Sequence, residues 1–432
     1  MNDVGQIVRA AKLASLRLAH AGGPERRAVL LAMADLLERE SRRAALFAAN
    51  AEDIAEAEAA RDRGELSSAL VDRLRLGPEK LESLADGLRQ LAAQVDLIGR
   101  VTLDRELDEG LELRRVTCPL GVLGVVFEAR PDAVPQIVGL AVRTANAVVL
   151  KGGKEARRTN AVMVAVLREA VVDQGFDAGL IGHLEEREDV DALLQVPRGV
   201  DLVIARGSTA FVRHVQASTR IPVLGHAEGL CHLYLHHSAT SGIASRIAVD
   251  AKCSYPAACN SIETLLWEPG SEHSLAACVA ALRDAGVELR GCEATRALHP
   301  DLVPAGELDW STEYGDLILS IKRVHDIYGA LEHIETYGSQ HTETIVAEDE
   351  QAAAMFVAAV DAAGVFHNAS SRFADGYRYG LGAEVGISTS KLHARGPVGV
   401  DGLVTYRWLL RGQGHVASAY GPGKRRLRHR DR

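Results

Sequence analysis

One cysteine has the surroundings expected of a nucleophile. Cys259 follows the segment Tyr255-Pro256-Ala257-Ala258 and comes directly before Asn260 and the apolar run 262–267. Proline and small residues favour a turn, and a thiol at the junction of a turn and a strand can meet a ligand as a thiolate nucleophile. Most cysteines are instead small core residues, and Cys253 is the closest competitor for the role.

Two glycine-containing turns are suited to phosphate groups. The segment Lys151-Gly152-Gly153-Lys154-Glu155 follows an apolar run and precedes a helical pattern. Its glycines allow close backbone approach to an anion, while the lysines and the helix N-terminus supply positive charge. The segment Arg206-Gly207-Ser208-Thr209 has the same position in a later unit, where Ser208 is either an ordinary N-cap or a pyrophosphate ligand. Two such turns favour an extended dinucleotide, which needs several contacts along one sheet edge.

Four polar residues in loops are candidates for binding a substrate. Arg130, Asp132, His393 and Arg395 stand in loops with proline or glycine. The alternative for each is a surface position with local hydrogen bonds. The chain contains no GxGxxG, GxxxxGKS/T, GxSxG or HExxH pattern, which argues against an ordinary Rossmann dehydrogenase and a P-loop nucleotidase.

Short apolar runs alternate with helical patterns around the two turns. From Gly121 the predicted order is strand 122–127, helix 133–145, strand 147–151, helix 155–174, strand 202–205, helix 208–217 and strand 221–224. This order is typical of βαβ units. The continuously apolar strands predict a parallel sheet covered on both faces, with ligands beyond the carboxyl ends of the strands.

Three further regions complete the predicted organisation. Residues 1–98 have helical spacing, and residues 101–107 and 111–117 predict a hairpin around Asp108-Glu109-Gly110. A second α/β unit begins after about residue 228, with strands 231–235, 262–267, 317–323 and 343–347 and helices 241–252 and 272–285. A late strand near 403–406 can pair with the hairpin. The basic tail 421–432 is predicted to be a solvated, frayed end.

Composition excludes several classes of protein. A chain of 432 residues predicts two or three domains, and its net charge of −9 argues against nucleic-acid binding. No apolar stretch approaches the roughly 20 residues that span a bilayer, and the N-terminus lacks a signal-peptide core. Six irregularly spaced cysteines indicate a reduced, cytoplasmic compartment. The pair His236-His237 lacks cysteine or acidic partners at ligand spacing, so we expect no metal site.

Four stretches of the chain carry a family resemblance. They are CPLGVLGVVFEARPD (118–132), TANAVVLKGGKEA (144–156), PAACNSIETLL (256–266) and YGLGAEVGISTSKLHARGPVGVDGL (379–403). With them the chain resembles the gamma-glutamyl phosphate reductases (glutamate-5-semialdehyde dehydrogenases), a branch of the aldehyde dehydrogenase superfamily, over roughly residues 10–420. The resemblance implies NADPH-dependent reduction of glutamate 5-phosphate to glutamate 5-semialdehyde and phosphate, the second step of proline synthesis from glutamate.

The same resemblance implies an α/β fold of the aldehyde dehydrogenase type. A parallel-sheet dinucleotide-binding domain takes residues 1–100 and 119–227, and an α/β catalytic domain with Cys259 takes 228–365. A β oligomerisation flap takes 101–118 and 390–425, residues 366–389 return to the active site, and 426–432 form the tail. The implied partners are further copies of the chain, as a dimer or tetramer, and a transiently docked, separate glutamate 5-kinase.

The resemblance also implies roles for the candidate residues. Cys259 attacks the acyl carbonyl and forms a thioester, which hydride from the nicotinamide converts to the semialdehyde. The segment from Lys151 to Glu155 matches the loop that binds the adenosine ribose and phosphate, where Lys154 can meet a 2′-phosphate. The segment from Arg206 to Thr209 would contact the pyrophosphate. Glu313 resembles the glutamate that holds the nicotinamide ribose.

An oxyanion forms when the thiolate attacks, and it needs hydrogen-bond donors. The backbone N–H of Cys259 is the expected first donor, with a second from the loop that contains Arg130 and Asp132. Many relatives have asparagine where this chain has Asp132. Because an ionised aspartate cannot donate, either Asp132 is protonated or another group donates. The further candidates for contacting the oxyanion or the substrate's phosphate or carboxylate are Arg130, Asn260, His393 and Arg395.

The water-activating base of hydrolytic aldehyde dehydrogenases is displaced in this sequence. Those enzymes have a Glu-Leu-Gly-Gly segment, and the corresponding stretch here is Gly225-His226-Ala227-Glu228-Gly229, with His226 at the base position. This favours a reductase, because an enzyme that releases aldehyde gains nothing by hydrolysing its thioester. Two alternatives stay open: an oxidising aldehyde dehydrogenase that releases free acid, with Glu228 as the nearby acid, and an inactive oligomeric partner protein.

Overall fold

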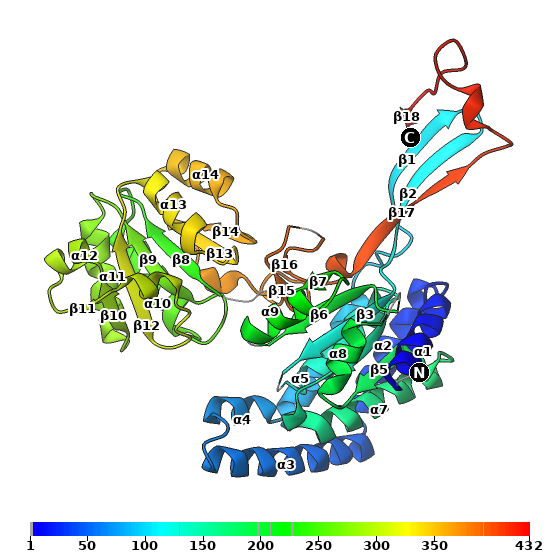
Figure 1. Ribbon diagram of the computed structural model, residues 1–432, viewed down its shortest axis with the longest axis horizontal. Coiled ribbons are helices and arrows are strands. Elements are labelled where there is room, and N and C mark those ends of the chain that lie inside the picture. The colour runs from blue at the N-terminus through cyan, green and yellow to red at the C-terminus, as the bar shows by residue number, and fades with distance from the viewer. Residues whose placement is uncertain (1–2, 129, 197–198, 208, 226–228, 392) are drawn as a thin grey trace.

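The computed structural model describes residues 3–128, 130–196, 199–207, 209–225, 229–391 and 393–432. Two α/β units stand next to each other, and a narrow β arm projects from one of them (Figure 1). No helix within these ranges is long and apolar enough to cross a membrane. Each unit has its own sheet. A site between the units is therefore formed by the strand ends of the two sheets that face each other.

Five helices precede the first sheet. They are α1 (Asp3–Leu18), α2 (Gly23–Glu38), α3 (Glu40–Asp62), α4 (Ser68–Leu74) and α5 (Pro78–Ala93). Proline stands in the first turn of α2 and α5, and Ser67 caps α4 by accepting the N–H of Leu70. Apolar residues from Val8 in α1 to Leu88 in α5 belong to the same core as the first sheet. The predicted helical start is confirmed, and it is part of the first unit.

The first sheet is parallel, with strand order β5-β4-β3-β6-β7. Its strands are β3 (Val122–Phe127), β4 (Ala147–Lys151), β5 (Ile181–Leu184), β6 (Leu202–Arg206) and β7 (Val223–Leu224). The intervening helices are α6 (Ala133–Arg143), α7 (Arg157–Asp173), α8 (Glu188–Leu194) and α9 (Thr209–Ser218), with short 3₁₀ turns η1 (Lys154–Ala156) and η2 (Ala178–Leu180). The predicted βαβ order is confirmed. The apolar pattern does not predict β5 and α8.

The second sheet is also parallel, with strand order β11-β10-β12-β9-β8-β13-β14. Its strands are β8 (Cys231–Leu235), β9 (Ile262–Trp267), β10 (Glu288–Gly291), β11 (Val303–Pro304), β12 (Ile318–Arg323), β13 (Thr342–Val346) and β14 (Gly364–His367). The helices are α10 (Ser241–Cys253), α11 (Glu272–Asp284), α12 (Glu293–Leu298), α13 (Ile327–Tyr337) and α14 (Glu350–Ala359), with η3 (Glu307–Ser311) before β12. The strands β8 and β9 that flank the candidate cysteine are central and buried.

The projecting arm is a four-stranded antiparallel sheet in the order β17-β2-β1-β18. It contains β1 (Val101–Asp108), β2 (Leu111–Pro119), β17 (Val404–Arg411) and β18 (Arg430–Asp431), with η6 (Ala417–Ala419) between the last two. Gly110 provides the positive φ of 72° that the tight turn requires. The predicted hairpin and its late partner strand are therefore both present.

The prediction of a frayed C-terminal tail is wrong. The tail residues Arg430 and Asp431 pair with β1, and Arg432 forms ion pairs with Glu106 and Glu112. Arg428 also contacts Asp108 at 3.3 Å. The acidic side chains at this edge of the arm attract the basic tail, and the exposed backbone of β1 gives it a partner.

The segment between the second sheet and β17 returns to the first unit. It contains η4 (Ser371–Phe373), the short antiparallel pair β15 (Ile387–Ser388) and β16 (Gly396–Pro397), and η5 (Asp401–Leu403). Ala383, Val385 and Val398 belong to the core of the first unit. The chain therefore passes over the region between the two sheets, and its side chains are available to a site there.

Candidate active site

A cleft of about 640 Å³ lies where the two units meet. One wall comes from the carboxyl ends of β3 and β6, with Phe127 and Arg206, and the opposite wall from the turn that contains Cys259. The return segment forms a third wall through residues 372–387. Of the predicted site residues, the cleft brings together Arg130, Arg206, Gly207, Cys259, Asn260 and Glu313.

The backbone of Cys259 is held from several sides. A Cβ on Gly229 would come within 2.5 Å of the Cys259 Cα, so only glycine fits beside it. The Sγ of Cys231 donates to the Cys259 carbonyl at 3.3 Å. The side chain of Asn260 donates to Ala374 O at 2.9 Å, and Ser371 Oγ donates to Asn260 O at 2.6 Å. The half-buried thiol thus stands in the cleft on a fixed turn.

The competing cysteine lies elsewhere. Cys253 ends α10 and lines a separate groove with Arg246 and Asp250, outside the cleft. Burial raises the pKa of the Cys253 thiol, which reduces its thiolate fraction. The geometry therefore favours Cys259 as the nucleophile.

Four arginines line the cleft, and two of them have side-chain partners. Arg73 donates to Tyr255 Oη at 3.5 Å, and Arg372 donates to Ser254 Oγ at 3.1 Å. Burial, with help from nearby Arg378, lowers the pKa of Arg372. Arg130 and Arg206 form no ion pair with any residue that the structure describes. Two of the four guanidinium groups in the cleft thus have no ion-pair partner among the described residues, and such groups suit an anionic substrate.

Four carboxylates also line the cleft, those of Glu128, Glu313, Asp375 and Glu384. Burial raises the pKa of Glu384, whose Oε2 accepts the N–H of Gly376 at 2.9 Å. Glu128 lies against Gly207, where an added Cβ would be 2.8 Å from its carboxyl carbon. Sequence reasoning did not single out Arg73, Arg372, Glu128 or Glu384. The family-like run 379–403 contains Glu384, and that is the only signal that pointed to it.

The first phosphate turn follows β4, next to β3 in the sheet. Lys151 is buried and donates from Nζ to Gly152 O at 2.6 Å, and burial lowers its pKa. Lys154 is exposed at the start of η1, between Gly153 and Glu155. These residues lie outside the cleft that contains Cys259. Lys151 is thus committed to the backbone, whereas Lys154 is exposed and lies near Glu65, whose pKa its charge helps to lower.

The second turn follows β6 and opens α9. Arg206 and Gly207 line the cleft. Ser208 lies outside the described residues, as do the base-position residues His226 and Glu228. Thr209 begins α9. The first half of this turn is thus placed opposite the candidate nucleophile.

Three predicted substrate residues are not brought to the cleft. Asp132 precedes α6, and its Oδ1 lies 3.5 Å from Lys80 Nζ. His393 has a φ of 57° and bonds Gly402 O through Nε2 at 2.8 Å. Arg395 pairs with Asp361 at 2.7 Å. The side chains of His393 and Arg395 thus bind Gly402 and Asp361. The glycine and proline beside them in the sequence do not predict these contacts.

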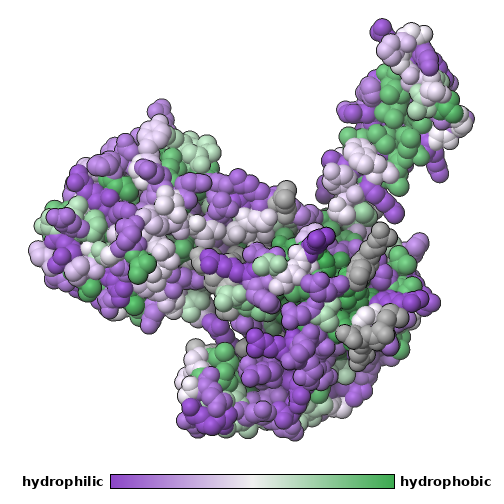
Figure 2. Space-filling view, in the orientation of Figure 1, coloured by the Kyte–Doolittle hydropathy of each residue, from purple (hydrophilic) through white to green (hydrophobic). Residues whose placement is uncertain are grey.

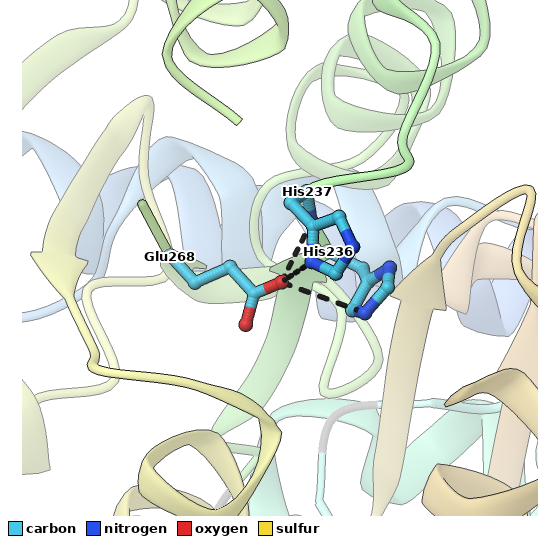
Figure 3. Close-up of side chains that lie close together, drawn as sticks. All are labelled: His236, His237 and Glu268. Carbon is cyan, nitrogen blue, oxygen red and sulfur yellow. Dashed lines mark hydrogen bonds and ion pairs between the residues drawn. The ribbon is translucent and has the colours of Figure 1, made fainter. Parts of the chain in front are cut away.

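A cluster of two histidines and a glutamate stands at the carboxyl ends of the central strands β8 and β9 (Figure 3). His236 and His237 follow β8, and Glu268 follows the adjacent strand β9. The Nδ1 of His237 lies 2.7 Å and the Nε2 of His236 lies 3.5 Å from the same Glu268 oxygen. The sequence prediction that this histidine pair has no acidic partner is wrong, because strand pairing supplies one.

Hydrogen bonding explains this cluster without a metal ion. Ser238 Oγ accepts the N–H groups of Glu348 and Asp349, both at 3.0 Å, so its own proton is free to go to His236 Nδ1 at 2.8 Å. In that arrangement the proton of the neutral imidazole is on the other nitrogen, Nε2, which lies 3.5 Å from Glu268. No fourth ligand accompanies the three side chains among the described residues.

Two α/β units that enclose a cysteine opposite the carboxyl ends of a parallel sheet define a protein of the aldehyde dehydrogenase class. Residues 1–227 match the aldehyde dehydrogenase family. A Synechococcus sp. (strain JA-2-3B'a(2-13)) gamma-glutamyl phosphate reductase is 54% identical over 409 residues, covering 94% of this chain and 89% of the relative. The Natronomonas pharaonis relative of that name is 50% identical over 96% and 94% of the two chains. The chain belongs to the gamma-glutamyl phosphate reductase family.

Solved structures agree with this assignment. Gamma-glutamyl phosphate reductase from Thermotoga maritima has 35% sequence identity and a TM-score of 0.92, covering 96% of this chain and all of the other (100%). An acetylating aldehyde dehydrogenase from Geobacillus thermoglucosidasius, 18% identical with a TM-score of 0.68 over 96% and 97% of the chains, shares the fold. The predicted fold class and family resemblance are both confirmed.

Proposed function

We propose that this protein reduces L-glutamate 5-phosphate to L-glutamate 5-semialdehyde and phosphate with NADPH, the second step of proline synthesis, in the cytoplasm. The observation that carries the proposal is Cys259, fixed in a cleft opposite the carboxyl ends of β3 and β6. The names of the relatives supply the substrate, since they are gamma-glutamyl phosphate reductases with about half their residues in common with this chain.

The chemical role of Cys259 follows from its position. Its thiolate attacks the acyl carbon, the bond from that carbon to the phosphate oxygen breaks, and inorganic phosphate leaves with the electron pair. A thioester remains on Sγ. When hydride reduces this carbon, the C–S bond breaks and the thiolate is restored. We expect the backbone N–H of Cys259 to stabilise the oxyanion, and the hydrogen bond from Asn260 to Ala374 supports the turn that carries it.

The residues present fit a dinucleotide. The carboxyl ends of β4, β3 and β6 are adjacent in the sheet, and the exposed Lys154 is a cation at one end of that edge. The turn from Lys151 to Glu155 would hold the adenosine side, the turn from Arg206 to Thr209 the pyrophosphate, and Glu313, in the cleft, the nicotinamide ribose. When bound, NADPH supplies the hydride.

The phosphate dependence of the reverse reaction tests this function. Purified protein with glutamate 5-semialdehyde and NADP⁺ should form NADPH only when inorganic phosphate is present, because phosphate must cleave the thioester. The measurement is the rate of NADPH absorbance increase over a series of phosphate concentrations. Turnover that is indifferent to phosphate would instead identify the hydrolytic alternative, and absence of any turnover with intact NADPH binding would favour the inactive partner protein.

We also infer that the β arm joins copies of this chain. Its strand β17 is an edge strand with exposed apolar side chains, and Figure 2 shows a hydrophobic band along the arm. The side chains of Tyr406, Trp408 and Leu410 are 54%, 51% and 60% exposed. An apolar edge strand of this kind is a template for pairing with another chain.

Leu410→Glu should therefore shift the protein from an oligomer toward a monomer. A charge at a contact that buries this leucine is unfavourable by several kcal/mol on an order-of-magnitude scale. Molar mass measured by light scattering during size-exclusion chromatography checks the shift. Leu308→Glu, at a leucine that is 81% exposed in the other unit, is the matched control and should leave the mass unchanged. If the molar mass of Leu410→Glu equals that of the wild type, the inference that the arm forms the interface between copies is wrong.

A further inference from the structure

The guanidinium of Arg206 is a charge that the fold itself does not explain. Arg206 ends β6, and its side chain lines the cleft together with Cys259. Its Nη1 is buried without a hydrogen-bond partner, and the described part of the chain offers the group no ion pair. Burying a charged donor without a partner is costly. The free-energy cost of burying Nη1 without an acceptor, in a cleft that also contains the candidate nucleophile, points to a ligand that supplies this acceptor.

The surroundings of Arg206 indicate the charge of that ligand. Arg130 also lines the cleft without an ion-pair partner among the described residues. Burial lowers the pKa of Arg206, and repulsion from Arg130 lowers it further. The guanidinium of Arg206 nevertheless remains charged at neutral pH. Glu384 and Asp132 are near enough to attract Arg206, but neither forms an ion pair with it, and burial raises the pKa of Glu384. Two cations with incomplete compensation suit a dianion better than a single carboxylate.

We propose that Arg206, assisted by Arg130, binds the phosphoryl group of the acyl phosphate while Cys259 attacks the acyl carbon. The proposal rests on the proposed function. As the bond from the acyl carbon to the phosphate oxygen breaks, negative charge grows on the leaving phosphate. A guanidinium can donate two parallel hydrogen bonds to phosphate oxygens and stabilises this charge. Arg206 thus determines specificity for an acyl phosphate over an uncharged acyl derivative.

The competing role for Arg206 is to bind the dinucleotide pyrophosphate, as its place in a phosphate turn predicts. That role uses the backbone N–H groups of the turn at the start of α9. The side chain of Arg206 is instead part of the same cleft as Cys259, Asn260 and Arg372. Both ligands contain phosphate, so the experiment must measure inorganic phosphate and cofactor separately.

Reverse-direction kinetics of Arg206→Gln separate the two ligands. With semialdehyde fixed, the KM for inorganic phosphate should rise by about 10- to 100-fold, because a charged hydrogen-bonding partner is removed. The KM for NADP⁺ should change by less than about threefold, and so should the NADPH dissociation constant from fluorescence titration. Arg206→Lys keeps the positive charge but loses the two parallel N–H donors of the guanidinium. Its KM for phosphate should therefore lie between those of the wild type and Arg206→Gln.

A matched control is available in the same cleft. Arg73 lines it but bonds the Tyr255 hydroxyl, so Arg73→Gln should raise the phosphate KM by less than about threefold. An unchanged phosphate KM in Arg206→Gln, or a rise in the NADP⁺ KM of equal size, would overturn the inference. If Arg206→Gln does not fold, the same comparison applies to Arg206→Lys. Wild-type turnover without phosphate would defeat the proposed function itself, whereas phosphate-dependent wild type with an insensitive Arg206→Gln would defeat only this assignment.

Discussion

Cys259→Ser is expected to lower the turnover number by about 10³- to 10⁴-fold, because a serine hydroxyl is hardly ionised at neutral pH and forms an ester in place of a reducible thioester. The substitution changes one atom, and the surrounding turn is held by bonds to the Asn260 side chain and to backbone carbonyls. The fold should therefore persist. The rate of phosphate-dependent NADPH formation is the measurement, and NADPH binding should stay close to that of the wild type.

Cys253→Ser is the matched control for this prediction. Cys253 is also half-buried but lines a groove away from the cleft. Its replacement should leave the turnover number within about twofold of the wild type, since surface changes away from a site have small effects. Alkylation with iodoacetamide should inactivate the wild type and Cys253→Ser equally. Substantial activity in Cys259→Ser, or inactivity of Cys253→Ser, would assign the nucleophile differently.

Periodicity predicts much of the fold because most strands of the first sheet are continuously apolar. The apolar pattern does not predict the strand Ile181–Leu184, because Gly182 and His183 interrupt its apolar run. The structure shows why glycine is there: a Cβ on Gly182 would lie 2.8 Å from the side chain of Ile7 in α1. The contact between Gly182 and Ile7 thus requires a glycine in this strand, and the glycine interrupts the apolar run by which a strand is predicted. No window of neighbouring residues contains that information.

The same limit applies to the candidate site. Local sequence identifies Cys259 and the turn at Arg206, because a proline-containing turn and a glycine after a strand are local features. It does not show that Arg372 and Glu384, more than a hundred positions after the cysteine, fold over the same cleft. It also does not show that Arg395 is paired with Asp361. Which loop residues reach a site is decided by long-range packing, and only the three-dimensional arrangement reveals it.

At about pH 9, Lys252→Met is expected to destabilise the protein by about 3–5 kcal/mol, because it leaves the ionised, buried Glu263 without its cation. Lys252 lies in α10 before Cys259, and Glu263 lies in β9 after it. Their charged atoms are 2.7 Å apart, and the side chains are 0% and 2% exposed. The second oxygen of Glu263 accepts the N–H of Gly315 at 3.4 Å, so the pair also supports the loop of Glu313. Urea unfolding measures the change in free energy.

The pH dependence of this loss has a definite sign. Burial raises the pKa of Glu263 to about 7, against the attraction of Lys252, from the ordinary value of 4.5. A carboxyl whose pKa is raised on folding gives stability that is present below its unfolded-state pKa and is lost as pH rises through the folded-state pKa. Without Lys252 that pKa rises further. The difference between Lys252→Met and the wild type should therefore be small near about pH 5 and grow up to about pH 9.

The double variant Lys252→Met with Glu263→Leu distinguishes the effect of losing the lysine charge from the effect of losing the packing of its side chain. Removing both charges leaves no buried ion, so most of the lost free energy of unfolding should return and its pH dependence should disappear. Arg63→Met, which breaks an ion pair whose side chains are 57% and 58% exposed, should leave the unfolding midpoint unchanged. A double variant as unstable as Lys252→Met would mean that the methylene groups of the lysine, rather than its charge, support the turn before Cys259.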